Sequence, residues 1–287
     1  MPAQQPDNMR INASPTKEFF IHMLVRDIPL NRAIIDLVDN SVDGAQRIRN
    51  TGNCEGLWIR LEVKPEKFRI ADNCGGIPID VARDYAFRFG RTNATPSTLH
   101  SIGQFGVGMK RTFFKLGKCF RVKSATSISK FTIEIDVDEW KTRQTAEGAE
   151  DWHFEFKTLE DEISVPEEEQ GTIIEIDRLH DSVAESFGQD FFLNRLSQEI
   201  AVAHSISLER GLSMTLNGIP LLNDPLKLLQ SDEISPAYAE RSYDNFGRQP
   251  VYAKLYAGLS DRSKEEGGWY VFCNGRLVVR ADQSNLQ

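Results

Sequence analysis

The sequence has few of the features that indicate an extracellular, metal-binding or membrane-spanning protein. Its 287 residues include only four cysteines, and no two of them form a Cys-x-x-Cys pair. This scatter argues against a disulfide framework and a zinc site, and reduced thiols in a cytoplasm are the simplest expectation. No apolar run approaches the roughly 20 residues that span a bilayer, and residues 1–7 lack the charged and apolar regions of a signal peptide. We therefore expect a cytoplasmic protein with no membrane partner.

The sequence also lacks an excess of positive charge. It has 34 Lys and Arg residues against 42 Asp and Glu residues, which gives a formal net charge of -8. A generally basic surface for nucleic acid is therefore not expected, although a local basic patch is compatible with this composition. With 40% hydrophobic and 26% charged residues, the chain can form one large or two medium domains with a real core.

One segment with the spacing of a helix, residues 31–45, carries the first chemical signal. Its apolar stripe consists of Ile34, Leu37, Val38 and Val42. On a neighbouring face, Asp36, Asn40 and Asp43 recur at spacings of four and three. A carboxylate and a carboxamide one turn apart suit a magnesium nucleotide, because Mg²⁺ prefers oxygen ligands in octahedral geometry. Taken alone, the spacing is more typical of a solvated acidic face.

Two glycine-containing segments follow, Asp-Asn-Cys-Gly-Gly-Ile at residues 72–77 and Gly-Gln-Phe-Gly-Val-Gly-Met-Lys at residues 103–110. An aspartate at a strand end provides a fixed hydrogen-bond acceptor, and the glycines after it let the backbone approach a flat base. Glycines at a loop-to-helix transition let amide groups face phosphate oxygens, where the helix dipole favours negative charge. The structural alternatives are an ordinary strand-to-turn segment and a solvent-facing Lys110.

In this order, the three segments resemble the N box, the adenine motif and the phosphate motif of Bergerat-type ATPases, the superfamily of gyrase B, Hsp90, histidine kinases and MutL (GHKL). A fourth segment, residues 171–176, resembles the strand in which the family places a threonine near the adenine-binding aspartate. The resemblance covers about residues 16–205 and is closest to the MutL and MORC branch. It implies that ATP and Mg²⁺ are bound.

The resemblance also implies a role for each matching residue. Asn40 matches the magnesium-coordinating asparagine, Asp43 the second acid on the adenine side, and Asp72 the acceptor of a hydrogen bond from the adenine amine. The other residues expected to contact the nucleotide are Gly76, Ile77, Gly103, Gln104, Phe105, Gly106, Val107, Gly108, Met109, Lys110 and Thr172. Cys74 stands where the family motif has glycine, so the turn after Asp72 departs from the family pattern.

The main departure concerns the catalytic base. Asp36 stands where hydrolysing members usually carry glutamate, and aspartate is shorter by one methylene, about 1.5 Å of reach. Because a misplacement of about 1 Å can lower a rate by on the order of 100-fold, we expect slow turnover if Asp36 is the base. Gly44 replaces a common alanine, which is expected to loosen the helix by up to ~1 kcal/mol.

The expected fold is α+β. A flexible N-terminus over residues 1–15 precedes a Bergerat two-layer sandwich with a mixed sheet over residues 16–208. Residues 209–287 are expected to form an incomplete transducer-like (S5-like) α/β domain, with a hairpin turn at Asn274-Gly275. Patterns of helical and strand type predict helices over 16–26, 79–89 and 105–116, and strands over 57–63, 67–72, 119–126, 131–137, 152–158, 172–177, 212–221 and 250–259.

The sequence therefore predicts an ATP-binding protein with slow Mg²⁺-dependent hydrolysis that acts as a conformational and dimerisation switch. An ATP-dependent homodimer and an effector protein or downstream domain are the expected partners, and nucleic acid stays an open question. Two alternatives remain. A non-hydrolysing ATP sensor is favoured by the short Asp36, and a histidine-kinase-type phosphotransfer domain needs no water-activating carboxylate. Residues 1–15 contain no phospho-acceptor helix, which disfavours the kinase.

Overall fold

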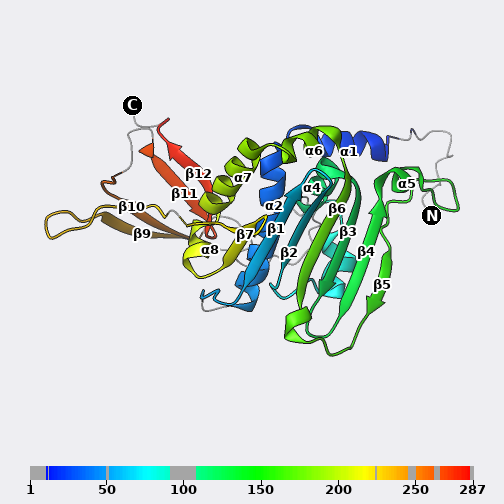
Figure 1. Ribbon diagram of the computed structural model, residues 1–287, viewed down its shortest axis with the longest axis horizontal. Coiled ribbons are helices and arrows are strands. Elements are labelled where there is room, and N and C mark those ends of the chain that lie inside the picture. Colours follow the sequence, from blue (N-terminus) through cyan, green and yellow to red (C-terminus); the bar gives the residue numbers. More distant parts are fainter. Residues whose placement is uncertain are drawn as a thin grey trace, which may run out of the picture. The chain divides into compact units, whose positions relative to one another are not determined.

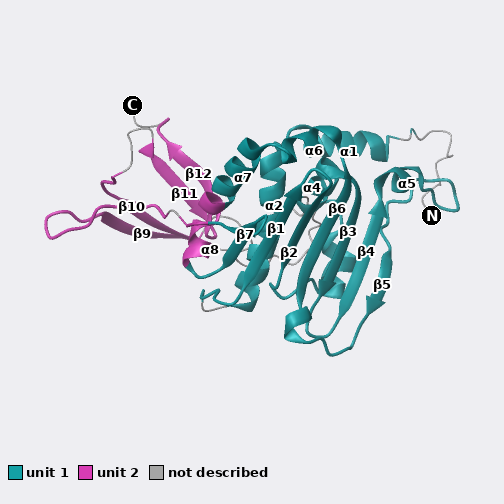
Figure 2. Cartoon of the chain, viewed as in Figure 1, with its two compact units in different colours: residues 1–200, 210–221 teal, residues 201–209, 222–287 magenta. Residues whose placement is uncertain are grey.

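The computed structural model describes residues 11, 13–49, 52–90, 108–223, 225–244, 250–261 and 266–284. The chain divides into two compact units (Figure 2). The first consists of Met1–Ile200 and Arg210–Leu221, and the second of Ala201–Glu209 and Leu222–Gln287. Among the helices that the structure describes, none combines the length and the apolar character needed to cross a membrane.

The first unit is built on an eight-stranded sheet with the strand order β5-β4-β3-β6-β2-β1-β7-β8 (Figure 1). Its strands are β1 (Trp58–Lys64), β2 (Lys67–Asp72), β3 (Gly117–Ala125), β4 (Lys130–Asp136), β5 (Phe156–Glu160), β6 (Gly171–Leu179), β7 (Ser213–Leu216) and β8 (Ile219–Pro220). β1 and β7 run parallel, and the other neighbouring strands run antiparallel. The predicted fold class, α+β with a mixed sheet, is confirmed.

Helices α2 and α4 pack against each other and against this sheet. The helices that begin in the first unit are α1 (Lys17–Arg26), α2 (Leu30–Ile48), α3 (Ile79–Val81), α4 (Gly108–Leu116), α5 (Val137–Thr142), α6 (Asp181–Phe187) and α7 (Asp190–Ala203), with a π-helical turn η2 (Ala82–Ala86) and a 3-10 turn η3 (Glu167–Glu169). The predicted apolar stripe of α2 is buried, as expected for a helix that covers a sheet. The Thr112 hydroxyl of α4 donates a hydrogen bond of 2.6 Å to the Ala33 carbonyl of α2, which fixes the two helices in register.

Side chains alternate along the strands between a buried and a partly exposed face, as β4 shows. On the partly exposed face, six charged residues from six neighbouring strands form a row that we call the charge row: Lys157, Glu134, Arg121, Glu175, Arg69 and Glu62. Basic and acidic residues alternate along it, and the nitrogen-oxygen distances from Arg121 to Glu134 and from Arg69 to Glu62 are 3.2 and 3.1 Å. Partly exposed pairs of this kind each contribute about 0.2–1 kcal/mol.

Two predicted elements of the first unit were placed wrongly. The helix predicted over 79–89 is a short α3 followed by a π-helical turn that ends at Ala86. The strand predicted over 152–158 begins only at Phe156. Trp152 and Phe154 instead join an aromatic cluster, with ring centroids 5.7 and 5.4 Å from that of Trp140. The alternating aromatic residues of this segment are typical of a strand, but in the structure Trp152 and Phe154 belong to a loop that packs into the cluster.

The second unit contains α8 (Ser205–Glu209) and two hairpins, β9 (Ala237–Tyr243) with β10 (Val251–Ala257) and β11 (Trp269–Cys273) with β12 (Arg276–Asp282). The predicted turn at Asn274-Gly275 is confirmed, because both residues have the positive φ values, 52° and 84°, that a tight hairpin turn needs. β9 was not predicted. Residues 210–221, which the sequence assigned to the second domain, belong to the first unit, because β7 pairs with β1.

A buried histidine of the second unit leads to a prediction about stability. His204 is fully buried, and burial, with a smaller contribution from the charge of Arg276, lowers its pKa to about 3. In the unfolded chain the pKa is about 6.5, so below that pH the unfolded state binds a proton that the folded state excludes. The contribution of the neutral His204 to the free energy of unfolding is therefore complete above about pH 6.5. It decreases as the pH falls, and at pH 5 it is lower by about 2 kcal/mol.

Urea unfolding at pH 7 and pH 5 measures this difference. In His204→Gln, the loss of stability between the two pH values should be about 2 kcal/mol smaller than in the wild type. The exposed His22 offers a matched control, and His22→Gln should retain the wild-type pH dependence. A His204→Gln protein with an unchanged pH dependence would contradict the assignment.

Candidate functional site

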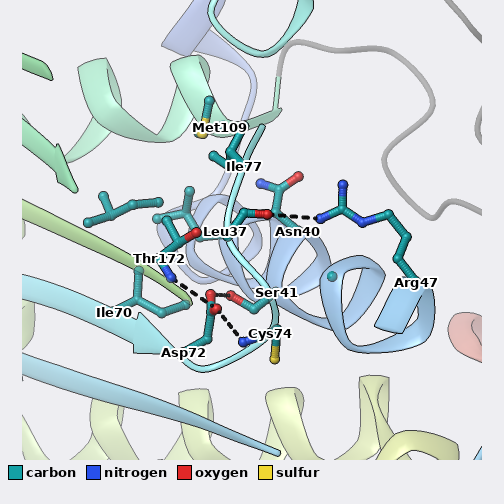
Figure 3. A pocket seen from close by; sticks show the side chains of 13 residues that line it. Leu37, Asn40, Ser41, Arg47, Ile70, Asp72, Cys74, Ile77, Met109 and Thr172 are labelled. Atoms are coloured by element: carbon teal, nitrogen blue, oxygen red, sulfur yellow. Dashed lines mark hydrogen bonds between the residues drawn. The ribbon is translucent and has the colours of Figure 1, made fainter. Parts of the chain in front are cut away.

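A cavity of about 400 Å³, a volume that includes space open to solvent, lies between α2, the end of β2, the start of β6 and the start of α4 (Figure 3). Helix α2 contributes one face, with residues spaced by three, one, three and three: Leu37, Asn40, Ser41, Gly44 and Arg47. The other walls are formed by Ile70, Asp72, Cys74, Gly76, Ile77, Met109, Thr172 and Ile174. The cavity is mostly apolar with a few polar groups, a composition typical of a small-molecule site.

The polar centre of the cavity is the carboxylate of Asp72, at the end of β2. Its Oδ2 atom accepts a hydrogen bond of 2.6 Å from the Ser41 hydroxyl. Its Oδ1 atom accepts from the backbone amides of Cys74 and Thr172, at 2.9 and 3.2 Å. Figure 3 shows the three hydrogen bonds converging on this side chain. They fix the carboxylate, because donors from three different segments hold it in one orientation.

The surroundings of Asp72 also set its charge. The residue is 8% exposed, and burial raises its pKa, although the three hydrogen bonds and the positive charge of Arg47 act in the opposite direction. The carboxyl group therefore takes up a proton at a higher pH than an exposed aspartate does. Burial also raises the pKa of the neighbouring Cys74 thiol, so this cysteine is not a nucleophile at neutral pH.

Two glycines of the cavity wall are required by close packing. Gly76 has a φ of +69°, and a Cβ atom there would lie 2.1 Å from the Ala125 carbonyl oxygen. At Gly44, a Cβ atom would lie 2.7 Å from the Cys74 carbonyl oxygen. From the sequence, glycine at position 44 was expected only to lower the stability of the helix. The structure supplies the reason for it, since α2 and the turn after Asp72 approach too closely there for alanine.

A serine that the sequence analysis missed connects the turn to the sheet. The Ser124 hydroxyl of β3 accepts a hydrogen bond of 2.8 Å from the Ile77 amide. It also lies 3.0 Å from the Thr172 hydroxyl, to which it is joined by a further hydrogen bond. No sequence pattern distinguishes Ser124 from other strand residues. Only the strand register, which places it opposite Thr172, reveals its position.

The acidic residues predicted on α2 separate in the structure. Asn40 lines the cavity, and its amide nitrogen donates a hydrogen bond of 3.0 Å to the Asp36 carbonyl oxygen. Asp36 is not among the lining residues, and its carboxylate forms an ion pair with Arg111 of α4, with 2.8 Å between Oδ2 and Nη2. Asp43 is half-buried and is also absent from the cavity wall.

Of the residues predicted to contact a nucleotide, the structure brings Asn40, Asp72, Gly76, Ile77, Met109 and Thr172 together around the cavity. Gly103, Gln104, Phe105, Gly106 and Val107 lie outside the described residues. Lys110 is buried, and its ammonium group donates a hydrogen bond of 2.8 Å to the Ala86 carbonyl. The alternative of a solvent-facing Lys110 was therefore wrong.

The residues around the cavity determine how a magnesium ion can be held. Within the described part of the chain, no three acidic, histidine or cysteine residues gather into a metal site. Asn40 is exposed, and because its Nδ2 atom binds the Asp36 carbonyl, its Oδ1 atom is the one that can face a cation. A single carboxamide ligand fits Mg²⁺ only when the other ligands are phosphate oxygens and waters, as is usual for this ion.

A family described as "Histidine kinase-, DNA gyrase B-, and HSP90-like ATPase" matches residues 28–172. Two structures of the ATPase region of Saccharomyces cerevisiae topoisomerase II, the second bound to ICRF-187 (dexrazoxane), are similar with 13% and 14% identity and TM-scores of 0.46 and 0.45. Each comparison covers 67% of this chain and 48% of the other, so the chain spans about half their length. No protein of curated function matches.

Proposed function

The chain belongs to the histidine kinase-, DNA gyrase B- and HSP90-like ATPase family, and from this premise we propose that it binds ATP in the cavity beside α2 and hydrolyses it slowly with Mg²⁺. The observation that carries the proposal is the fixed Asp72 carboxylate inside a mostly apolar cavity. An adenine ring needs apolar walls for its faces and one oriented acceptor for its amine, and the cavity offers both.

Each part of the site has a role in this proposal. Asp72 accepts a hydrogen bond from the adenine amine, and Ile77 and Met109 contribute apolar contacts to the nucleotide. Asn40 would hold Mg²⁺, and the ion would supply positive charge to neutralise the phosphates. Asp36, one turn before Asn40 on α2, is the candidate base that orients and deprotonates the attacking water.

One observation favours a second function, a non-hydrolysing ATP sensor. The Asp36 carboxylate is short, and it is occupied by an ion pair with Arg111 rather than presented to the cavity. A carboxylate in this position is poorly placed to orient the attacking water, because its Oδ2 atom already binds the Arg111 guanidinium. In the sensor, ATP binding alone would change the conformation, and release of the nucleotide would reset it.

We further propose that ATP binding drives homodimerisation, and that the dimer transmits this conformational change to an effector protein or a downstream domain. Support comes from the second unit, where the sequence of residues 272–276 resembles a strand in the transducer domain of MutL-like proteins and forms the turn region of the β11-β12 hairpin. We also propose a cytoplasmic location, because the four cysteines are all free thiols. Light scattering with and without a non-hydrolysable ATP analogue tests the dimer.

Phosphate release from the purified protein tests the proposed function. With Mg²⁺ present, we expect ATP binding and slow release of phosphate, and with EDTA we expect release to stop. ATP binding without any release would favour the sensor. Absence of ATP binding, measured by titration calorimetry, would remove both functions and the assignment of the cavity.

Replacing Asn40 with alanine should remove the magnesium dependence of ATP binding and leave the fold intact. Within the described part of the chain, its side chain makes one hydrogen bond, to a carbonyl of its own helix, so little stability depends on it. The measurement is ATP affinity with Mg²⁺ and with EDTA. Asn31→Ala provides a matched control on the same helix, since Asn31 binds Glu199 outside the cavity. If Asn40→Ala kept the full magnesium dependence, Asn40 would not be a ligand.

A further inference from the structure

Arg111 of α4 and Asp36 of α2 form an ion pair that connects the start of α4 to the candidate catalytic base. The Arg111 Nη2 atom lies 2.8 Å from Asp36 Oδ2, and the two side chains are 33% and 22% exposed. At this exposure the pair is only partly screened by water, so it lies between a surface pair and a buried one. The Arg111 Nε atom is buried and has no hydrogen-bond partner among the described residues.

The pair is held in place by contacts on both sides. One residue after Arg111, the Thr112 hydroxyl donates to the Ala33 carbonyl of α2 at 2.6 Å. Three residues before it, Gly108 packs on the base itself, since a Cβ atom there would lie 3.3 Å from Asp36 Oδ2. The guanidinium and the carboxylate therefore meet because the packing of α4 on α2 fixes the positions of both residues.

The same packing holds Arg111 on the helix turn that contributes Met109 to the cavity wall. It lies in the first turn of α4, whose Met109 lines the cavity, and its partner Asp36 is tied to Asn40 through the Asn40 amide. A guanidinium binds phosphate through two parallel hydrogen bonds, and it does so better than a lysine does. The buried Nε atom without a partner is a donor that such a contact would use.

We propose that Arg111 is a positioning residue. It holds Asp36 in an inactive ion pair until the terminal phosphate of ATP binds the guanidinium in its place. The proposal rests on the function proposed above. With no nucleotide, or with ADP, the carboxylate stays paired with Arg111. When a γ-phosphate is present, it competes with Asp36 for the same cation, and the freed carboxylate turns to water.

Competition for one cation has a signature in binding that does not depend on turnover. Asp36→Asn removes the competing charge, so the non-hydrolysable analogue AMP-PNP should bind about 5- to 10-fold more tightly, while ADP affinity should change less than about twofold. Arg111→Ala should weaken AMP-PNP binding about 10- to 100-fold and leave ADP affinity nearly unchanged. Arg111→Lys should restore only part of the loss, because a lysine makes a point contact.

The double variant separates competition from simple charge repulsion. If Asp36 acts by occupying Arg111, then Asp36→Asn should have no effect on AMP-PNP affinity once Arg111 is alanine. If Asp36 merely repels phosphate, the tightening should persist in the double variant, and the proposal would be wrong. Arg121→Ala is the matched control, since Arg121 is also 33% exposed and ion-paired, but lies in the charge row away from the cavity.

Calorimetric titration of all variants with ADP and AMP-PNP in the presence of Mg²⁺ therefore decides the question. An equal loss of affinity for both nucleotides in Arg111→Ala would assign Arg111 a structural role and overturn the proposal. If the wild type binds both nucleotides but the Asp36 and Arg111 variants do not show the expected changes in affinity, only this inference fails. Should the wild type bind neither, the proposed function fails as well.

Discussion

Asp72→Asn is expected to abolish ATP binding and to leave the fold intact. An asparagine can keep its oxygen towards the Cys74 and Thr172 amides, and its amide can then donate to the Ser41 hydroxyl, so each local hydrogen bond has a substitute. The adenine amine, however, would then meet a second donor where it needs an acceptor. A buried mismatch of this kind costs several kcal/mol, on the order of 1,000-fold in affinity.

Titration calorimetry with ATP measures this loss, and thermal unfolding checks the fold. Ser41→Ala serves as the matched control, because it removes one donor to Asp72 and leaves the acceptor in place, and we expect a loss of about tenfold or less. In the wild type, ATP affinity should also weaken as the pH falls, because burial raises the Asp72 pKa and the protonated carboxyl is a poorer acceptor. Unchanged ATP affinity in Asp72→Asn would remove the adenine assignment.

Asp36→Ala is expected to lower the rate of ATP hydrolysis by about 100- to 10,000-fold, the range typical of removing a general base, with ATP binding retained. Asp36→Glu should instead raise the rate, since the added methylene restores the reach to the attacking water. Both changes are read from phosphate release at saturating ATP. If both variants hydrolyse ATP at the wild-type rate, another group activates water.

The ion pair with Arg111 refines this expectation. Because Arg111 engages the Asp36 carboxylate, the slow hydrolysis that we propose would have two separate physical origins, a short side chain and an occupied one. Asp36→Glu relieves the first, and competition by phosphate for the guanidinium relieves the second. A wild type that binds Mg-ATP tightly and releases no phosphate would show that neither is relieved in the bound state, and the sensor would then be the function.

The predictable part of the site is the part that is encoded within short segments. The helical spacing from Asp36 to Asp43, the strand end at Asp72 and the Gly171-Thr172 pair are local patterns, and β2 and β6 do pair with Asp72 opposite Thr172. Extending the helical spacing could have found Arg47, which lies two turns after Asn40, and Ser41, which lies one turn after Leu37. The fold class was expected from the family resemblance that these segments carry, and local periodicities supplied only the individual helices and strands.

The part of the site that the sequence did not predict depends on pairs of residues that are distant in sequence and belong to no recognisable motif. Asp36 and Arg111 are 75 residues apart, and Ile77 and Ser124 are 47 apart. No periodicity links such pairs, since only the packing of α4 on α2 and the strand register bring them together. The turn after Asp72 is similar, because its need for glycine at position 44 arises from a collision with a backbone atom 30 residues later.

The charge row has a consequence for folding specificity. The strands that carry it fall into a basic set, β5, β3 and β2, and an acidic set, β4, β6 and β1, and in the sheet every neighbour comes from the opposite set. Two strands of the same set would repel if they paired, because like charges directly opposite each other destabilise a ladder. The sheet joins segments as distant as Asp72 and Thr172, 100 residues apart. Alternating charge therefore disfavours incorrect strand orders that hydrophobic alternation alone would accept.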